Sequence, residues 1–440
     1  MTHRADRTLV TTGLARVEGE GSMYVRVTDG QVEQVRLEIY EPPRFFEAFL
    51  RGRSYTEPPD ITARICGICP VAYQTSACWA IESACGVALP PELGVLRRLL
   101  YCGEWISSHA LHIYMLHAPD FLGYPGAVEM ARDHREIVER GLALRRTANA
   151  IMATIGGRSV HPVNVRVGGF YRVPTRAELE PLADRLRTTL DLAVETVRWV
   201  AGFDFPDYSF DHELMSLHDP GRYPIERGSV VTSGGLEFAA AEFEQHVIEE
   251  QVPYSMALHA RLADRAAGAV LGSGFYLTGP LARYSLNSRW LPPVAAESAH
   301  AAGLGDTCRN PFQSIVVRAV EVVCAVEEAI RLIEEYVPPA EPYIAVEPRA
   351  GTGHGVSEAP RGLLYHRYEL DQAGMIVSAR IVPPTSQNQG AIQDDLRGFV
   401  ADRLDFDDER LTLACEQAIR NYDPCISCAT HFLDLRMDRR

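Results

Sequence analysis

Arg-Ile-Cys-Gly-Ile-Cys-Pro at residues 64–70 and Asp-Pro-Cys-Ile-Ser-Cys-Ala-Thr-His at residues 423–431 are the two segments that constrain this fold most strongly. Each carries two cysteines separated by two residues, which lets both sulfurs of a pair turn toward one metal ion. Soft thiolates favour zinc, nickel, copper(I) or iron–sulfur chemistry over magnesium or calcium. If both pairs bind one metal, the first fifth of the chain must fold onto its last twentieth.

A structural zinc site is the simplest alternative interpretation of the two pairs. In four-cysteine zinc sites the pairs usually lie some tens of residues apart in a small module. Here Cys69 and Cys425 lie 425 − 69 = 356 positions apart, in a chain long enough to bury a core without a metal. Spacing alone leaves zinc, a redox metal and unrelated thiols open.

Composition places the chain among folded globular proteins. Of its 440 residues, 46% are hydrophobic and 23% are charged, which is ordinary for such proteins. The net charge of −15 and the lack of a basic stripe argue against a nucleic-acid partner. We see no signal peptide in Met1–Val10 and no apolar run long enough to span a membrane, so we expect a cytoplasmic chain with reduced thiols.

The periodicity of apolar residues predicts a mainly α-helical chain with small β-hairpins, an α+β fold. Helical periodicity covers residues 92–117, 126–155, 176–202, 236–268, 310–336 and 409–421. Thr175 and Glu178 have the spacing of a capping box, which predicts a helix start there.

Alternating apolar residues predict two hairpins, one over residues 22–40 around Asp29-Gly30 and one over 363–381 with its turn at 371–374. The Pro- and Gly-rich stretch 337–355 is expected to be a connector. These patterns divide the chain into an N-terminal hairpin segment (1–60), a helical core with the first cysteine pair (61–336) and a C-terminal segment with the second pair (337–440).

Taken together, the two cysteine segments resemble those of nickel–iron hydrogenase large subunits, which carry Arg-x-Cys-Gly-x-Cys near the N-terminus and Asp-Pro-Cys-x-x-Cys-x-x-His at the C-terminus. Further motifs occur in the family's order: Arg16–Gly19, Arg44-x-x-Glu47, Gly156–Phe170, Glu358–Gly362 and Val382–Thr385. The resemblance implies the family's fold, with a core of long helices, and reversible heterolytic cleavage of H2 at a Ni–Fe centre.

The resemblance also implies roles for the matching residues at the Ni–Fe centre. Cys66 and Cys425 would be terminal nickel ligands, whereas Cys69 and Cys428 would be shared between nickel and iron. The iron in this family bears CO and cyanide, to which the guanidinium of Arg361 could donate hydrogen bonds. Pro360 and Thr385 match residues that border these ligands.

Three other residues match functional positions of the family. Glu18 would take the proton that heterolytic cleavage leaves beside Cys425. Glu47 and His431 would bind a magnesium or iron ion, together with a main-chain carbonyl near Arg380 or Ile381.

Within the family, the chain is most similar to the cytoplasmic, pyridine-nucleotide-linked members known as group 3b or sulfhydrogenases. The segments at 69–74 and 383–390 carry this similarity, whereas Tyr73 and Ser108 replace a His and an Asp of membrane-linked members. The resemblance implies an iron–sulfur small subunit and flavin and iron–sulfur diaphorase subunits that pass electrons to NAD(P). This division of labour fits the absence of a dinucleotide fingerprint from the chain.

The family is also made with a short extension after the terminal histidine, which a maturation protease removes. The resemblance therefore implies that Phe432–Arg440 is cleaved from this chain. An H2-sensing regulatory subunit would carry the same metal site and stays an alternative. Relatives in respiratory complex I lack the cysteine pairs, which counts against a metal-free quinone-linked subunit.

Overall fold

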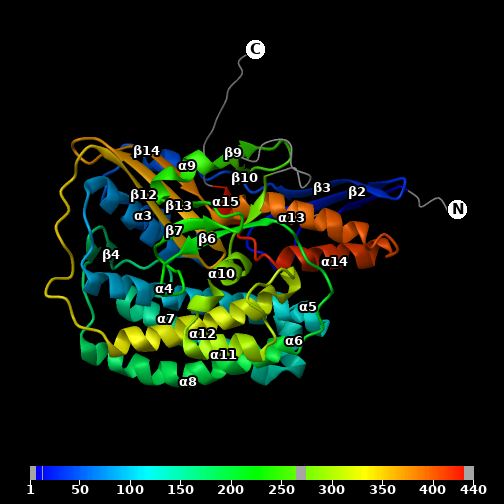
Figure 1. Ribbon diagram of the computed structural model, residues 1–440, viewed down its shortest axis with the longest axis horizontal. Helices are drawn as coiled ribbons and strands as arrows, with labels where there is room; N and C mark the ends of the chain where they lie inside the picture. The colour runs from blue at the N-terminus through cyan, green and yellow to red at the C-terminus, as the bar shows by residue number, and fades with distance from the viewer. Residues whose placement is uncertain (1–5, 12, 264–273, 431–440) are drawn as a thin grey trace, which may run out of the picture.

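The computed structural model describes residues 6–11, 13–263 and 274–430. Four long helices form one layer of the molecule: α4 (Pro91–Leu111), α7 (Arg135–Gly156), α8 (Arg176–Ala201) and α12 (Ser314–Glu334). They run side by side in the lower half of Figure 1, and α4 and α12 contact each other directly. The expected core of long helices is confirmed.

Several predicted helices are found close to their expected bounds. Thr175 caps α8 through the predicted capping box, in which its hydroxyl accepts a hydrogen bond from the Glu178 amide and its own amide donates to the Glu178 carboxylate. Helix α14 (Asp408–Arg420) matches the prediction over 409–421. The predicted helix 92–117 is α4 followed by a π-helical turn, η1 (His112–His117). The prediction over 126–155 is divided at His134 into α6 (Ala127–Asp133) and α7.

The predicted helix over 236–268 is wrong. Its described part contains β8 (Glu237–Phe238), η2 (Ala240–Glu242), the short helix α9 (Phe243–His246) and a hairpin of β9 (Val247–Gln251) and β10 (Leu258–Leu262). Pro253 lies between these two strands. A proline in a helix interior removes a hydrogen bond and clashes with the preceding turn, so this stretch turns back as a hairpin. Residues 264–268 lie outside the described part.

The N-terminal hairpin is confirmed as β2 (Gly21–Thr28) and β3 (Gln31–Ile39). Asp29 and Gly30 at its turn have φ of 51° and 75°, the left-handed pair that a tight two-residue hairpin requires. A third strand, β1 (Arg7–Val10), extends the sheet beside β2. This hairpin projects from one end of the molecule in Figure 1.

The C-terminal hairpin is confirmed as β13 (Gly362–Leu370) and β14 (Ile376–Val382). Part of the expected connector, however, forms a third strand, β12 (Gly351–Ala359), which pairs with β13. Gly353 and Gly355 let β12 pack against α3 (Pro70–Cys85), since a Cβ on Gly353 would lie 2.0 Å from the Ala80 carbonyl oxygen. The glycines that suggested a connector instead permit close packing of a strand against a helix.

Helix α13 (Pro384–Ala401) was not predicted. It contacts both β3 and β10. The C-terminal helix α15 (Ile426–Ala429) lies beside α13. An isolated parallel bridge joins Glu18 to Cys425, so a segment near the N-terminus contacts a segment near the C-terminus.

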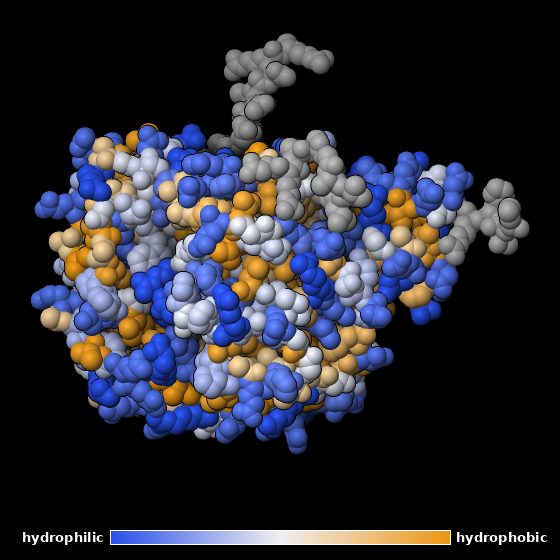
Figure 2. Space-filling view, viewed as in Figure 1, coloured by the Kyte–Doolittle hydropathy of each residue, from blue (hydrophilic) through white to orange (hydrophobic). Residues whose placement is uncertain are grey.

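Shorter elements complete the described chain: α1 (Phe46–Leu50), α2 (Pro58–Thr62), α5 (Ala118–Leu122), β4 (Val165–Arg166), β5 (Gly169–Phe170), β6 (Glu213–His218), β7 (Ser229–Thr232), β11 (Tyr276–Leu277), α10 (Pro280–Asn287), η4 (Ser288–Trp290), α11 (Pro293–Ala301) and η5 (Pro311–Gln313). Figure 2 shows hydrophilic and hydrophobic residues interspersed on one face. Among the described residues, no helix has the length and apolar character needed to cross a bilayer.

Candidate metal centre

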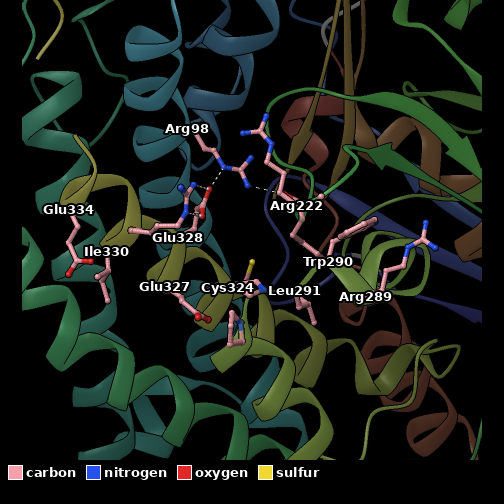
Figure 3. A pocket seen from close by; sticks show the side chains of 15 residues that line it. Arg98, Arg222, Arg289, Trp290, Leu291, Cys324, Glu327, Glu328, Ile330 and Glu334 are labelled. Atoms are coloured by element: carbon pink, nitrogen blue, oxygen red, sulfur yellow. Dashed lines mark hydrogen bonds and ion pairs between the residues drawn. The ribbon is translucent and has the colours of Figure 1, made fainter. Parts of the chain in front are cut away.

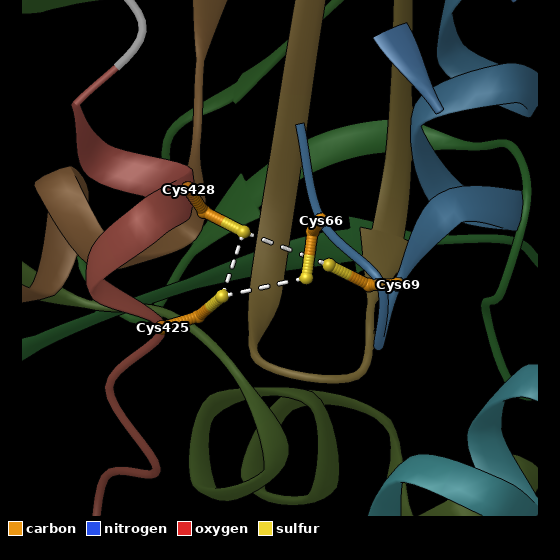
Figure 4. Close-up of side chains that lie close together, drawn as sticks. All are labelled: Cys66, Cys69, Cys425 and Cys428. Carbon is orange, nitrogen blue, oxygen red and sulfur yellow. Dashed lines mark hydrogen bonds between the residues drawn. The ribbon is translucent and has the colours of Figure 1, made fainter. Parts of the chain in front are cut away.

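The four cysteines of the two sequence segments lie together inside the protein. Their sulfur atoms all lie within 4.8 Å of one another, and Figure 4 shows them pointing toward a common point. The Sγ atoms are 3.5 Å apart for Cys66 and Cys425, 3.7 Å for Cys69 and Cys428, and 2.8 Å for Cys425 and Cys428. None of the four side chains is more than 3% exposed. A soft metal fits this set of ligands.

Each pair is held where a helix begins. Cys69 is the N-cap residue of α3 and Cys425 is the N-cap residue of α15. The N-terminal end of a helix such as α3 favours negative charge, which helps to stabilise a thiolate. Glu104 from α4 accepts hydrogen bonds from the first amides of α3, those of Val71 (2.5 Å) and Ala72 (3.0 Å). The first pair is therefore anchored to the helical layer.

The acid–base properties of the four thiols differ strongly because the sulfurs are so close. Hydrogen bonds from Cys425, Cys428 and Cys69 hold the pKa of Cys66 well below its usual range. Burial, together with the other sulfurs, raises the pKa of Cys425 well above its usual value. Four buried thiols cannot all ionise without a cation among them. The cluster therefore suits a divalent metal centre.

Glu18 lies directly beside one of these sulfurs. Its Oε2 accepts hydrogen bonds from Cys425 Sγ at 3.1 Å and from the Ser427 amide at 3.0 Å. Its carbonyl oxygen accepts a bond from the Ile426 amide at 2.8 Å. These contacts fix the carboxylate at a position where it can exchange a proton with Cys425.

Arg361 is a buried cation close to the thiols, in the turn between β12 and β13. Its Nε donates to the Asp423 carbonyl oxygen at 2.8 Å, and a terminal nitrogen lies 3.0 Å from Asp423 Oδ1. Another nitrogen donates to the Ser108 hydroxyl at 3.4 Å. Burial opposes the charge of Arg361, but Asp423, Cys425 and the other sulfurs raise its pKa well above the usual value. A permanent positive charge therefore lies beside the sulfur cluster.

Two neighbouring residues named in the sequence analysis have clear positions. The Thr385 hydroxyl accepts a hydrogen bond from the Cys425 amide at 3.0 Å, so Thr385 orients a candidate ligand. The Pro360 carbonyl oxygen accepts a bond from Arg283 at 2.9 Å. This bond fixes the turn that carries Arg361.

The expected second metal site is only partly described. Glu47 reaches β14, where its Oε1 accepts a hydrogen bond from the Ile381 amide at 2.7 Å. Burial raises the pKa of Glu47 to about 7 despite that bond. His431 and the segment Phe432–Arg440 lie outside the described residues. The carbonyl oxygens of Thr430 and Ser427, just before His431 in the chain, accept hydrogen bonds from the amide and the guanidinium of Arg44.

Sequence reasoning missed Glu104, Asp423 and Ser427 as parts of the site. Glu104 carried a weak signal, because an acid amid the buried stretch of α4 is uncommon without a partner. Three buried histidines of α4 and η1 are each bonded to other groups, His112 to the Arg420 carbonyl oxygen at 2.8 Å. His109 pairs with Glu321 at 2.9 Å, and His117 is bonded to Asn421 Oδ1 at 2.9 Å.

A cavity of about 810 Å³ lies apart from the cysteine cluster. Figure 3 shows side chains that line it, including Arg98, Trp290 and Cys324. The four clustered cysteines are not among the lining residues. Arg98 is already paired with Glu328 at 2.5 Å. This cavity therefore does not belong to the metal centre.

The amino-acid sequence of this chain is similar to those of several known proteins. A family model described as nickel-dependent hydrogenase matches residues 44–140 and 313–431. The sulfhydrogenase 1 subunit alpha of Pyrococcus furiosus is 32% identical over 426 residues, covering 96% of this chain and 97% of the relative. The sulfhydrogenase 2 subunit alpha of the same organism is 33% identical over 430 residues, covering 96% and 98%.

Solved structures agree with the fold. The chain superimposes with a TM-score of 0.87 on a chain of an NAD⁺-reducing [NiFe]-hydrogenase crystallised in the H2-reduced state, at 28% identity and covering 97% of this chain and 99% of that one. A [NiFeSe]-hydrogenase of Dm. baculatum gives a TM-score of 0.77 at 22% identity, with 97% and 100% covered, and so shows the shared fold.

Proposed function

Since this chain belongs to the nickel-dependent hydrogenase family, as the catalytic large subunit of a nickel–iron hydrogenase, we propose that it cleaves and forms H2 reversibly at a centre held by Cys66, Cys69, Cys425 and Cys428. The observation that carries the proposal is the convergence of these four buried sulfurs within 4.8 Å of one another. These four thiolates would hold a Ni–Fe centre, to which we assign Cys66 and Cys425 as ligands of nickel alone and Cys69 and Cys428 as ligands of both metals.

The protein's main contribution to the reaction is to hold and move a proton. When bound, the metal centre supplies Lewis-acid and redox chemistry, accepting the two electrons of H2. Glu18 Oε2 lies 3.1 Å from Cys425 Sγ, within reach of a proton on that sulfur. We assign Glu18 the role of taking this proton from Cys425 Sγ during H2 cleavage and returning it during H2 formation.

Arg361 is assigned to the diatomic ligands of the iron. A guanidinium has five N–H donors, and two of its hydrogen bonds go to Asp423. Its remaining donor capacity suits CO and cyanide, and its charge offsets that of the thiolates. Pro360 and Thr385 border this part of the site, with Thr385 orienting Cys425.

A second metal is proposed at Glu47. A carboxyl that burial brings to a pKa of about 7 is stabilised as a carboxylate by a bound cation. Magnesium, or iron, would be held there by Glu47, His431 and a main-chain carbonyl near Arg380 or Ile381. This site would lie next to the C-terminal end of the mature chain.

The proposed partners follow from the relatives. The named relatives include alpha subunits of sulfhydrogenases and the NAD-reducing hydrogenase HoxS subunit beta of Cupriavidus necator. We propose that this chain works in the cytoplasm with an iron–sulfur small subunit and with flavin and iron–sulfur diaphorase subunits that deliver electrons to NAD(P). A maturation protease is proposed to remove Phe432–Arg440.

The decisive assay uses the purified complex with its metals. H2-dependent reduction of NADP⁺ or NAD⁺, together with exchange of D2 against water protons, is the expected result. A complex that binds H2 and exchanges D2 slowly, but does not reduce a nicotinamide or an artificial dye, would indicate the alternative function of an H2 sensor. Loss of both activities in a nickel-loaded complex would contradict the proposal.

A further inference from the structure

Ser427 links Glu18, the proposed proton acceptor, to a second carboxylate. The function proposed above does not use this second carboxylate. Glu41 follows β3 and accepts hydrogen bonds from the Ser427 hydroxyl, at 3.0 Å to Oε1 and 3.3 Å to Oε2. Ser427 is also the residue whose amide binds Glu18 Oε2 at 3.0 Å. The two carboxylates thus bind the amide and the hydroxyl of the same serine.

Gly19, the residue after Glu18, leaves room for the side chain of Glu41. Gly19 follows Glu18 with a φ of 93°, and a Cβ there would lie 2.7 Å from Glu41 Oε2. The same Cβ would lie 2.6 Å from a side-chain carbon of Ile426. Any side chain at Gly19 would push Glu41 away from Ser427, so the missing side chain makes the contact possible.

Resting on the role proposed for Glu18, we propose that Ser427 and Glu41 form the next steps of the proton route from the metal centre to water. The Glu18 carboxyl passes its proton to Ser427 Oγ while the hydroxyl passes its own proton to Glu41, and no electrons move. The Ser427 hydroxyl is bonded to Glu41 and not to Glu18 in this structure, so the transfer requires a rotation about the Ser427 Cα–Cβ bond that brings the hydroxyl toward Glu18. Side-chain rotations of this kind take picoseconds to nanoseconds in exposed residues.

The position of Glu41 suits the outer end of this route. Cys425 is buried, Ser427 and Glu41 are half-buried, and Tyr40 and Pro42 on either side of Glu41 are exposed. A carboxylate that is open to water on one side and bonded to the relay hydroxyl on the other can release the proton to bulk solvent. During H2 formation the same groups would carry protons inward.

The test compares variants of the purified, metal-loaded complex by D2 exchange with water protons between pH 6 and 9. Glu41→Gln keeps the shape and still accepts a bond from Ser427, but it cannot carry a proton at neutral pH. Ser427→Ala removes the hydroxyl, and Ser427→Thr restores it. Glu38→Gln is the matched control, since Glu38 is an acid on β3 bonded to Ser22 and Arg36 and not to Ser427.

We expect Glu41→Gln and Ser427→Ala each to slow exchange by roughly 10²-fold, the lower end of what a positioned proton-transfer group contributes. Ser427→Thr should recover most of the rate lost in Ser427→Ala, and Glu38→Gln should exchange at the wild-type rate. The infrared bands of the CO and cyanide ligands should be unchanged in Glu41→Gln, because the hydrogen bond that holds Ser427 is retained.

Glu18→Gln in the same series separates the two proposals. If Glu18→Gln blocks exchange while Glu41→Gln and Ser427→Ala exchange at the wild-type rate, the relay is overturned and the role of Glu18 stands. If Glu18→Gln itself exchanges normally, the proposed role of Glu18 fails, and the relay fails with it. Shifted or missing infrared bands in Glu41→Gln would show a purely structural role and would also overturn the relay.

Discussion

Glu18 and Cys425 are 407 positions apart in the chain, yet Glu18 Oε2 lies 3.1 Å from Cys425 Sγ. The same two residues form an isolated parallel bridge between the N-terminal and C-terminal segments. The contact that joins the N-terminal and C-terminal segments is therefore also the contact at which we propose that a proton leaves the metal centre.

Replacing Glu18 by Gln tests this contact. The amide keeps the shape and can still accept the bond from the Ser427 amide, but it cannot take a proton from Cys425 at neutral pH. We expect H2 oxidation and D2 exchange to fall by on the order of 10²-fold or more, with nickel content unchanged. Glu18→Asp, which shortens the acid but keeps its chemistry, should retain more activity than Glu18→Gln. Equal activity in the two variants would argue against a proton-transfer role.

Arg361 should matter for stability as well as for activity. Arg361 and Asp423 form an ion pair in which each side chain is 2% exposed. Arg361→Leu would leave the Asp423 carboxylate buried and unpaired, at a cost of about 3–5 kcal/mol. Urea unfolding of the metal-free chain should show this loss, and Arg361→Lys, which keeps a charge, should lose less.

The control for Arg361 is an ion pair at the surface. Arg135 and Glu139 are 82% and 57% exposed, so Arg135→Leu should change the stability by less than about 1 kcal/mol. Similar losses in Arg361→Leu and Arg135→Leu would mean that the buried pair contributes no more than a solvated one.

The buried histidines should contribute less stability as the pH falls below 6.5. Burial lowers the pKa of His259 to about 4 and the pKa values of His112 and His117 well below 6.5. The unfolded chain therefore binds protons that the folded chain does not, so stability is fully present above 6.5 and is lost as the pH falls toward 4. These histidines lower the melting temperature at pH 5 relative to pH 7, whereas Glu47 and Glu358, whose pKa values burial raises to about 7, contribute in the opposite direction.

A histidine substitution checks the origin of that pH dependence. His259→Gln should show a smaller difference in melting temperature between pH 5 and pH 7 than the unchanged protein. His300 is exposed, so His300→Gln should leave the difference unchanged. An undiminished difference in His259→Gln would assign the pH dependence to other groups.

Processing of the C-terminal segment is tested by mass spectrometry. The nickel-loaded enzyme should end at His431, without the peptide Phe432–Arg440, whereas chain produced without nickel should retain it. Detection of the intact peptide in active, nickel-loaded enzyme would refute the proposed cleavage.

The sequence predicted the parts of this structure that local patterns control. The capping box at Thr175 is one example, since both of its hydrogen bonds join residues three positions apart. The cysteine cluster was predicted from two short motifs in a family's order, which imply that distant segments meet even though periodicity carries no such information.

The sequence did not predict the parts that depend on tertiary contacts. In α13, the run Thr385–Gln389 is polar and yet buried, so no amphipathic period marks a helix. Its polar groups are satisfied by distant partners; for example, Gln387 donates to the Leu363 carbonyl oxygen at 2.6 Å. Likewise, β12 was hidden because its glycines resemble a connector until α3 is packed against them.

The most direct test of the metal centre is metal analysis combined with infrared spectroscopy of protein purified from a host that can assemble the centre. We predict one nickel per chain, together with iron and infrared bands of CO and cyanide, and we expect the nickel and the bands to be lost in Cys66→Ala. Cys415→Ala, at a buried cysteine outside the cluster, should retain metals and bands. Zinc as the only metal in active protein, or nickel and infrared bands that persist in Cys66→Ala, would contradict the assignment of the four cysteines.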